Sequence, residues 1–258
     1  MKKFSDITNE EVNRIKLIMF DCDGVTIPLG TKVVEVESYE GTVLTVKSPK
    51  MTKEMLEKLT ELKEHFLIGF SSGRNMTFLM NLYRDILDER VILQAENGLF
   101  TLIDGTVVQN TNDFHLYIKE FREMQQKVRN IKHKNITGYE PKQFIITVHV
   151  LDRVPEIENL VAENKNFYCV YHKNEAYDIG VKKFDKGYGL RKLQEMLNLE
   201  KSEVLAVGNG GNDKPMLDVA VGVTVDKDNI QSDYFTRKKM QAGALEVINK
   251  LLEIKKSS

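Results

Sequence analysis

The chain of 258 residues is 41% hydrophobic and 29% charged, which is the composition of a globular protein with a sizeable core. Its 37 basic and 38 acidic side chains give a formal net charge of -1, so no global field gathers a polyanion and nucleic acid is not expected as a partner. The two cysteines are too few for a disulfide framework and suit a reducing compartment. A polar N-terminus, with no apolar run approaching about 20 residues, predicts a cytoplasmic protein without a membrane partner.

Short apolar runs alternate with helical spacings along much of the chain. Three apolar runs predict buried strands, and each run ends in small and polar residues. In chain order, the expected core elements are a strand at 16–20, a helix at 51–65, a strand at 66–70, a helix at 74–83, a helix at 187–197 and a strand at 204–207. This order predicts an α/β fold in which a mostly parallel sheet is covered by helices on both faces.

Two segments depart from that order. Apolar and polar residues alternate over 33–46, which predicts a β-hairpin that could act as a flap over a site. Residues 112–181 begin with a long polar helix at 114–132. A strand at 144–151, a helix at 155–164 and short strands at 167–171 and 176–179 are expected to follow. We therefore expect a catalytic core made of residues 1–111 and 182–258, with an α+β domain of residues 112–181 inserted into it.

The first strand ends in Asp21-Cys22-Asp23-Gly24. If the chain turns there, both carboxylates face one site while the glycine allows the backbone to approach a ligand closely. Two such carboxylates can divide the work, one attacking or binding metal and the other exchanging a proton. A loop in which the aspartates only cap the backbone is the alternative, and this motif alone does not decide between them.

Three later clusters add the other groups that phosphate chemistry needs. Ser72 and Gly73 precede a helix whose N–H groups would bind an anion, although a simple N-cap is the alternative. Lys186 begins a helix, where it opposes the macrodipole; neutralising a phosphoryl group would explain that placement, and a solvated surface lysine is the alternative. The loop 208–213 offers amide and carboxylate oxygens, which Mg²⁺ prefers, although a tight loop without metal would use the same glycines. Because ligands bind beyond the carboxyl ends of parallel strands, the clusters are expected to converge.

With these four clusters in this order, the sequence resembles the haloacid dehalogenase superfamily of phosphatases and phosphomutases. It is most similar to the branch whose α+β cap is inserted between the second and third motifs, which includes sugar-phosphate phosphatases and phosphomannomutase. Phosphatases of that branch often share the step Glu96-Asn97-Gly98. The resemblance covers almost the whole chain, and it implies a Rossmann-like parallel-sheet core with an inserted cap that acts as a lid and selects the substrate.

The resemblance also implies roles for single residues. Asp21 would attack phosphorus and form a phospho-aspartyl intermediate, while Asp23 would protonate the leaving oxygen and then deprotonate the hydrolytic water. Ser72 would hydrogen-bond the transferring phosphoryl group and Lys186 would hold its charge. Such positioning and charge neutralisation is what phosphoryl transfer chiefly demands of a protein.

A magnesium site and a phosphate site follow from the same resemblance. Mg²⁺ would bind the Asp21 carboxylate, the Asp23 backbone carbonyl and Asp213. Asn209 would be a further metal ligand, at a position where many family members carry Asp, so one anionic charge is lost there. Gly73 and Asn212 would join Ser72 and Lys186 in binding phosphate.

Three functions remain open on the sequence alone. The leading interpretation is a Mg²⁺-dependent phosphatase that hydrolyses a small phosphorylated metabolite, with a sugar phosphate as the first candidate. The second is a phosphomutase that uses the same aspartyl chemistry, which the core motifs do not separate from a phosphatase. The third is a sensor that binds a phosphorylated ligand without turnover, motivated by the missing carboxylate at Asn209. Neither the substrate nor the oligomeric state can be predicted from these residues.

Overall fold

The structure is a computed structural model and describes residues 1–257. The chain forms two compact units. Unit 1 contains Met1–Leu29, Lys50–Asn110 and the chain from Asp185 onward, and unit 2 contains Gly30–Pro49 and Thr111–Phe184. The structure thus groups the hairpin segment with the inserted domain, whereas the expected boundaries place it in the core.

Unit 1 is built on a sheet that has nine strands among the described residues. In the order in which they lie side by side, the strands are β1 (Lys2–Lys3), β15 (Tyr234–Phe235), β14 (Val221–Thr224), β13 (Val204–Gly208), β2 (Leu17–Asp21), β5 (Leu67–Ser71), β6 (Val91–Ala95), β7 (Phe100–Ile103) and β8 (Thr106–Gln109). The seven strands from β1 to β6 in this order are parallel. The predicted parallel sheet is therefore confirmed, and β7 and β8 extend it with an antiparallel edge.

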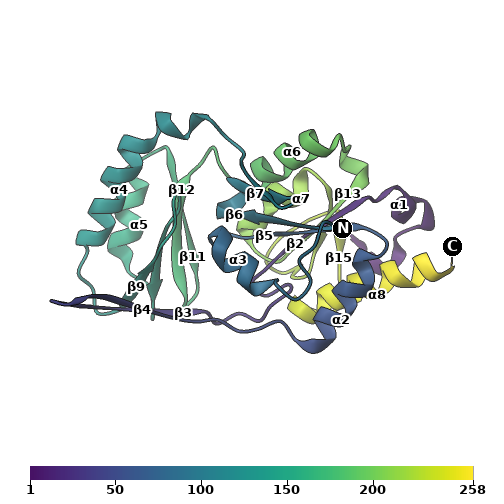
Figure 1. The fold of residues 1–258 in the computed structure, drawn as a ribbon, viewed down its shortest axis with the longest axis horizontal. Helices are drawn as coiled ribbons and strands as arrows, with labels where there is room; N and C mark the ends of the chain where they lie inside the picture. The colour runs from purple at the N-terminus through teal and green to yellow at the C-terminus, as the bar shows by residue number, and fades with distance from the viewer. Residues whose placement is uncertain (258) are drawn as a thin grey trace. The chain divides into compact units, whose positions relative to one another are not determined.

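Helices cover both faces of this sheet (Figure 1). The helices of unit 1 are η1 (Phe4–Asp6), α1 (Asn9–Arg14), α2 (Lys53–Lys63), α3 (Met76–Leu82), η2 (Glu96–Gly98), α6 (Lys186–Leu197), η4 (Lys201–Glu203), η5 (Gly211–Asp213), α7 (Lys214–Asp218) and α8 (Met240–Ser257). Helices α2 and α8 pack together on one face, and α6 and α7 pack together on the other.

The face under α6 shows why these residues fold as they do. Leu190 and Leu193, one turn apart on α6, are fully buried against Leu17 and Met19 of β2. Burying a leucine side chain contributes roughly 2 kcal/mol, so this apolar stripe fixes the helix on the sheet. The helix begins where the Asp185 side chain accepts a hydrogen bond from the N–H of Tyr188 at 2.7 Å.

Unit 2 contains an antiparallel sheet of four strands and a separate hairpin. The sheet order is β11 (Phe167–His172), β12 (Ala176–Val181), β10 (Ile146–Val150) and β9 (Ile136–Glu140), the helices are η3 (Asp113–Leu116), α4 (Ile118–Asn130) and α5 (Pro155–Ala162), and the hairpin is β3 (Lys32–Ser38) with β4 (Gly41–Lys47). The helix expected at 114–132 is divided into η3 and α4. Strand β3 is tied to β9 because Thr137 donates to the Val33 carbonyl at 2.7 Å and the Glu35 carboxylate accepts from the N–H of Tyr139 at 2.9 Å. These contacts explain why the hairpin belongs to unit 2.

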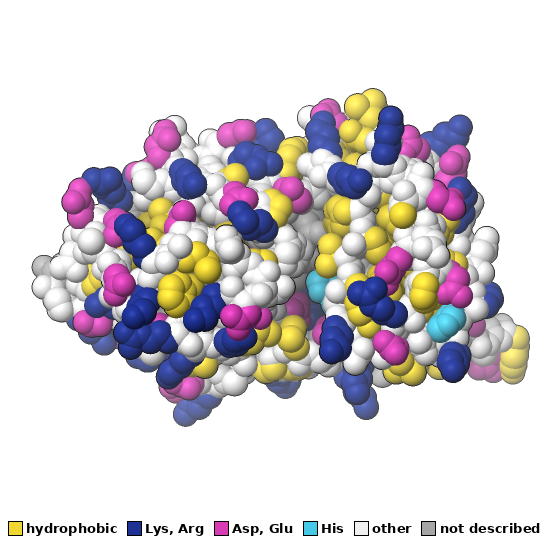
Figure 2. Space-filling view, turned by 180° about the vertical axis from the view of Figure 1, so that it is seen from behind, with side chains coloured by type: hydrophobic (Ala, Val, Ile, Leu, Met, Phe, Trp, Pro, Cys, Tyr) yellow, Lys and Arg dark blue, Asp and Glu magenta, His cyan; other side chains and the backbone are white. Residues whose placement is uncertain are grey.

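The surface carries charges of both signs. On the face drawn in Figure 2, the Lys and Arg side chains are interspersed with those of Asp and Glu. Within residues 1–257, no helix combines the length and apolar character required to cross a bilayer.

Candidate active site

Lys186 lies between two buried carboxylates at the carboxyl end of the unit 1 sheet. Its Nζ atom donates to Asp21 Oδ1 at 2.5 Å and to Asp213 Oδ1 at 2.6 Å. The three residues are 1%, 5% and 0% exposed, in the order Lys186, Asp21, Asp213. Asp21 ends β2, and the loop that contains Asp213 follows the neighbouring parallel strand β13, so strand order alone brings two of the predicted clusters together.

Burial and charge act in opposite directions on these groups. Burial raises the pKa of the Asp21 carboxyl to about 7, the Asp213 carboxylate adds to the increase, and Lys186 opposes it. Burial disfavours the Lys186 cation, but the two adjacent carboxylates outweigh that effect and raise its pKa, so the ammonium stays charged. With Asp21 ionised, the three groups carry one net negative charge in a buried position, which favours an additional cation.

Asp213 also organises its own loop. Its second oxygen, Oδ2, accepts hydrogen bonds from the N–H groups of Asn209 and Gly210, both at 2.9 Å. A Cβ atom on Gly208 would lie 2.5 Å from the Cβ of Asp213, so only glycine fits there. Both carboxylate oxygens are thus engaged with Lys186 or the loop backbone, and a metal ion would have to share them. The expected role of Asp213 as a metal ligand stays a prediction.

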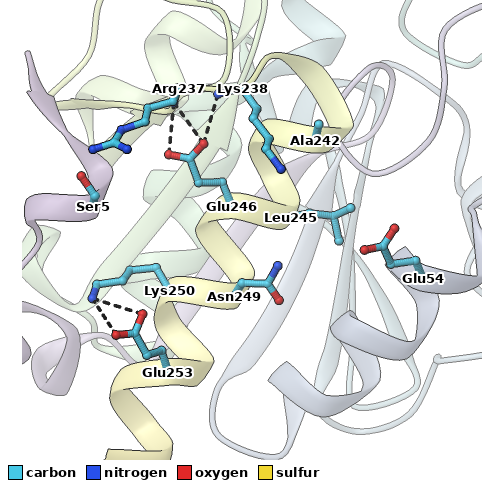
Figure 3. Close-up of a pocket in the computed structure, with 10 residues that line it drawn as sticks. All are labelled: Ser5, Glu54, Arg237, Lys238, Ala242, Leu245, Glu246, Asn249, Lys250 and Glu253. Atoms are coloured by element: carbon cyan, nitrogen blue, oxygen red, sulfur yellow. Dashed lines mark hydrogen bonds and ion pairs between the residues drawn. The ribbon is translucent and has the colours of Figure 1, made fainter.

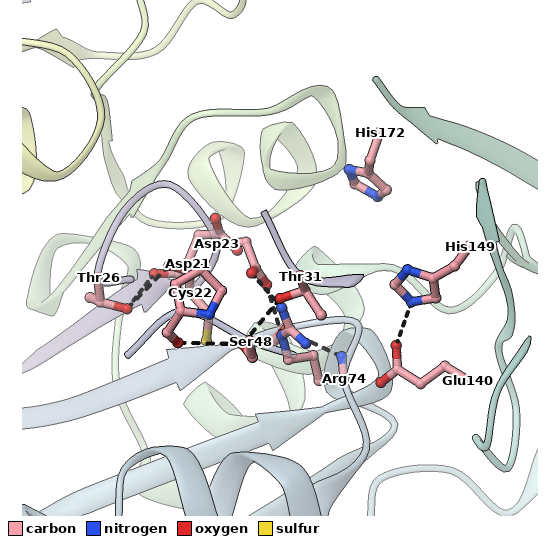
Figure 4. A network of polar contacts seen from close by, with 12 residues as sticks. Asp21, Cys22, Asp23, Thr26, Thr31, Ser48, Arg74, Glu140, His149 and His172 are labelled. Atoms are coloured by element: carbon pink, nitrogen blue, oxygen red, sulfur yellow. Dashed lines mark hydrogen bonds and ion pairs between the residues drawn. The ribbon is translucent and has the colours of Figure 1, made fainter. Parts of the chain in front are cut away.

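Asp23 is held by an arginine that follows the second cluster. Arg74 donates from Nε to Asp23 Oδ2 at 3.0 Å and from Nη2 to Asp23 Oδ1 at 2.6 Å, a pairing visible in Figure 4. The guanidinium is buried and lies 4.5 Å from the centre of the Phe78 ring. Such a two-pronged contact fixes the carboxylate in one orientation. This partner of Asp23 was not predicted from the sequence, although an arginine directly after Ser-Gly at a strand end was the available signal.

Ser72 lies in the loop that follows β5 and is 2% exposed. Its Oγ atom accepts a hydrogen bond from the N–H of Arg74 at 3.2 Å. Helix α3 begins two residues later than expected, and its cap is Asn75, whose side chain accepts from the N–H of Phe78 at 2.8 Å. Ser72 is therefore not the N-cap of this helix. Gly73 is half-buried within the same loop.

The turn Glu96-Asn97-Gly98 supports the Ser72 loop. All three residues have positive φ, at 49°, 57° and 84°. Non-glycine residues rarely adopt this conformation, and such strain persists only where the surrounding structure holds it. Here the N–H of Glu96 donates to the Arg74 carbonyl and the N–H of Asn97 donates to the Ser72 carbonyl, both at 2.9 Å. The turn thus positions the loop.

Asn209 contacts the backbone of the first motif. Its Nδ2 atom donates to the Asp23 carbonyl oxygen at 2.9 Å and lies 3.7 Å from the sulfur of Met240. The Asp21 carboxylate, the Asp23 carbonyl and, after rotation of the amide, Asn209 Oδ1 are oxygen donors, which suit Mg²⁺. Among residues 1–257, no group of three His, Cys, Asp or Glu side chains could hold a metal ion, so a site here needs backbone and amide oxygens. The Asp21 carboxylate, the Asp23 carbonyl and the rotated Asn209 amide are a set of oxygen atoms that fits a magnesium ion.

The predicted phosphate ligand Asn212 lies in the turn η5 and is half-buried. Its side-chain oxygen lies over Gly210, where an added Cβ would come within 2.6 Å of it. Among the site residues expected from the sequence, the structure thus connects Asp21, Lys186 and Asp213 directly and links Asn209 to Asp23. Ser72 is connected to Asp23 through Arg74, whereas Asn212 stays within its own loop.

A cavity of about 600 Å³ lies elsewhere in unit 1 (Figure 3). It runs along α8, and its lining consists of Ser5, Glu54, Arg237, Lys238, Ala242, Leu245, Glu246, Asn249, Lys250 and Glu253. Glu246 accepts hydrogen bonds from the N–H groups of Arg237 and Lys238, so its carboxylate stabilises the turn before α8. This cavity contains no residue of the four motifs and is not the candidate active site.

Unit 2 has a polar cluster of its own on the sheet β11-β12-β10-β9. Lys142, whose side chain is 2% exposed, donates to Thr147 Oγ1 at 2.6 Å and lies 3.5 Å from carboxylate oxygens of Glu140 and Asp178. The Nε2 atom of His149 lies 3.3 Å from the same Glu140 carboxylate (Figure 4). This cluster was not predicted from the sequence, because only the register of three strands brings its members together.

Comparison with known proteins agrees with this geometry. The profile of the family described as haloacid dehalogenase-like hydrolase matches residues 99–248, more than half of the chain. The chain belongs to the haloacid dehalogenase-like hydrolase family. The predicted family, and with it the predicted α/β core, is confirmed.

Two curated proteins and one solved structure are similar to this chain. A phosphoglycolate phosphatase of Nitrosopumilus maritimus is 25% identical over 229 residues, which cover 83% of this chain and 94% of that protein. A 5-amino-6-(5-phospho-D-ribitylamino)uracil phosphatase of Escherichia coli is 31% identical over 108 residues, covering 39% and 40% of the two chains. The C-terminal domain of C. albicans trehalose-6-phosphate phosphatase has the same fold, with a TM-score of 0.66 at 14% identity over 98% of each chain.

Proposed function

We propose that this protein is a Mg²⁺-dependent phosphatase that hydrolyses a small phosphorylated metabolite through a phospho-aspartyl intermediate on Asp21. The observation that carries the proposal is the buried contact of Lys186 with both Asp21 and Asp213 at the carboxyl end of the sheet. A lysine buried beside a carboxylate nucleophile can take the charge of an incoming phosphoryl group in a position where water does not screen it. The similarity to proteins named as phosphatases supports the same reaction.

The placement of the side chains supports the following reaction. An oxygen of the ionised Asp21 carboxylate attacks phosphorus, and the bond from phosphorus to the leaving oxygen breaks while Asp23 gives that oxygen a proton. Asp23 then takes a proton from water, whose oxygen attacks the same phosphorus. The bond between phosphorus and Asp21 breaks, which restores the carboxylate and releases phosphate. Arg74 holds the Asp23 carboxylate in a fixed orientation for both proton transfers.

Lys186 and Ser72 bind the transferring group in this scheme. Lys186 keeps its proton because of the two adjacent carboxylates, so it offers a permanent charge. Asp21, the Asp23 carbonyl, Asp213 and Asn209 would hold Mg²⁺, which would supply charge neutralisation and orientation of the phosphoryl oxygens. Sugar phosphates and phosphoglycolate are the first substrates to test, since the similar proteins carry the names of phosphatases for such compounds.

The test is phosphate release from a panel of sugar phosphates, phosphoglycolate and nucleotides, with Mg²⁺ and with chelator. Asp21→Asn should abolish release, whereas Asp85→Asn, an exposed Asp of the same unit, should leave it unchanged. During turnover, mass spectrometry should find a phosphoryl group on the peptide that contains Asp21. Metal-independent release, or release that survives Asp21→Asn, would refute the proposal. Conversion of a phosphoester without net release would indicate a phosphomutase.

One observation favours a second candidate, a sensor without turnover. Asn209 donates its amide to the Asp23 carbonyl, the oxygen that is expected to bind metal. If this contact replaces the metal, the protein would bind phosphorylated ligands but would not hydrolyse them. Calorimetry with inorganic phosphate in the presence of Mg²⁺ and of chelator separates the two cases. Equal binding in both conditions, with no turnover of the panel, would favour the sensor.

A further inference from the structure

The outer edge of the hairpin in unit 2 is an unpaired β-strand. Strands β3 and β4 pair in register from Ser38 opposite Gly41 to Lys32 opposite Lys47. Within residues 1–257, β4 pairs with no strand other than β3. Six of its seven residues are exposed, and Leu44 is half-buried. The outward backbone groups of β4 therefore meet only solvent.

The register decides which backbone groups point outward. The two-residue turn makes Ser38 and Gly41 a hydrogen-bonded pair, and hydrogen-bonded pairs alternate with non-bonded pairs along an antiparallel ribbon. Thr42, Leu44 and Val46 are consequently the residues whose N–H and C=O groups point away from β3. The backbone N–H and C=O groups of these three residues are therefore available to pair with another β-strand.

The sequence of β4 lacks the usual protection of an edge strand. Natural edges are interrupted by charged residues, proline or bulges, which prevent pairing with a second chain. Between Gly41 and Val46, β4 has no charge and no proline, and Thr42, Val43, Thr45 and Val46 are β-branched. The adjoining ribbon face exposes further apolar area at Val34, Val36 and Val43, which are 46%, 58% and 63% exposed. Such an edge strand favours pairing with a β-strand of a second chain.

The charges of the hairpin are segregated along its length. Lys32 and Lys47 form a pair at the base, whereas Glu37 precedes the turn and Glu40 lies in it. Glu35, in the middle of β3, forms an ion pair with Arg129 of α4 at 3.4 Å. An antiparallel alignment of two hairpins places the basic base of each next to the acidic turn of the other. Charge complementarity of this type selects the antiparallel arrangement, because a parallel alignment brings like charges together.

We propose that two copies of this chain associate through β4, which pairs with β4 of the second copy in antiparallel orientation about a two-fold axis at Leu44. In this register Leu44 lies opposite Leu44, Thr42 opposite Val46 and Val43 opposite Thr45 of the second copy. The outward backbone groups of Thr42, Leu44 and Val46 satisfy one another. Lys47 lies beside Glu40 of the second copy, and the two-fold axis repeats that ion pair. Such an isologous contact closes at two copies.

Charge reversal tests the arrangement in the full-length protein. Sedimentation of the wild type over about 1 to 100 µM should show reversible dimerisation, the range in which small interfaces dissociate. Glu40→Lys or Lys47→Glu alone should weaken the dimer about tenfold, because each replaces two attractive contacts with repulsion. The double variant Glu40→Lys/Lys47→Glu should restore wild-type affinity. Glu64→Lys, an exposed charge reversal on unit 1, is the matched control and should change nothing.

Cysteine cross-linking tests the register in a Cys169→Ser background. Val43→Cys and Thr45→Cys, mixed and oxidised, should form a disulfide between the two variants, because these positions lie opposite each other. Neither variant alone should cross-link, since its own copy is displaced by two residues. If two copies of Val43→Cys form a disulfide with each other while Val43→Cys and Thr45→Cys do not, the copies meet through the hairpin face that carries the valines and not through the β4 edges. That result, or a wild-type monomer at every concentration, would overturn the proposal.

Discussion

Gly98 and Gly189 meet backbone to backbone: a Cβ atom on either residue would lie 2.4 Å from the Cα atom of the other. Gly98 ends the turn that holds the Ser72 loop, and Gly189 lies on the first turn of α6, the helix that begins with Lys186. The contact therefore connects the loop that carries the hydroxyl with the helix that carries the lysine. Two glycines allow a closer approach than any other pair of residues.

Gly189→Ala should destabilise the protein even though alanine is the better helix former. Helix propensity alone would add about 1 kcal/mol of stability. The new methyl group meets backbone atoms, which cannot rotate away, and overpacking of this kind costs about 1–3 kcal/mol or more. We expect a net loss of about 1–2 kcal/mol, measured as the free energy of unfolding in urea. Arg191→Ala, at an exposed position of the same helix, is the control, and a Gly189→Ala variant as stable as wild type would contradict the close contact.

Replacement of Lys186 should affect stability and activity separately. In Lys186→Met, the buried Asp21 and Asp213 carboxylates lose their shared cation and repel each other, which should cost about 3–5 kcal/mol. Phosphate release should fall by about two to three orders of magnitude, because the phosphoryl charge is no longer neutralised.

The double variant Lys186→Met/Asp213→Asn distinguishes the two effects. Removing one carboxylate relieves the repulsion, so the free energy of unfolding should recover in part while phosphate release stays low. Recovery of both properties together would mean that Lys186 serves only the fold. The measurements are urea unfolding and phosphate release with Mg²⁺ on the same preparations.

The convergence of the candidate site residues could be predicted in part, because these residues follow strands that are adjacent and parallel. Asp21 and the loop 208–213 each come directly after an apolar run, and parallel strands bring such positions to one edge. Arg74 could not be assigned in the same way. Its partner Asp23 is 51 residues away, and nothing in either local sequence shows that the two side chains meet. A local sequence pattern cannot show which side chains meet when their contact depends on the path of a loop.

The antiparallel part of the sheet was missed for a different reason. Strands β7 and β8 are four residues each and are joined by Asp104-Gly105, a turn in which both residues have positive φ. This hairpin could have been predicted from the sequence, since Asp-Gly between short apolar runs is a strong turn signal. The position of hairpin β3-β4 in unit 2 could not be predicted, because it depends on contacts of Val33 and Glu35 with β9, about a hundred residues later.

Asn209→Asp should strengthen metal binding. The change restores an anionic oxygen beside the Asp23 carbonyl and removes the amide that donates to it. Because ligand charge tunes the affinity of oxygen sites for divalent cations, we expect the Kd for Mg²⁺ to fall about tenfold. Calorimetry without substrate measures this directly. Asn212→Asp, an amide in the same loop, is the control, and equal effects of the two variants would mean that only the net charge of the loop matters.

Acidification should reveal the charge on Asp178 in unit 2. Burial alone would raise the pKa of this carboxyl, but the Lys142 cation, together with hydrogen bonds from His172 and Thr147, holds it well below its usual range. Because the pKa is lower in the folded than in the unfolded protein, the ionised carboxylate stabilises the fold above pH of about 4, and this contribution is lost as the pH falls further. Asp178→Asn removes it at every pH.

Asp178→Asn should therefore be less stable than wild type by roughly 2–4 kcal/mol at pH 7, since it leaves Lys142 short of a partner. The difference should shrink as the pH falls below about 4, because the Asp178 carboxyl then takes up a proton in the unfolded wild type while it stays ionised in the folded protein. Urea unfolding at several pH values measures both effects. Asp113→Asn, which breaks an exposed ion pair with Lys183 in the same unit, should change stability far less. A loss for Asp178→Asn that is independent of pH would show that the side chain acts through packing and hydrogen bonding, and not through its charge.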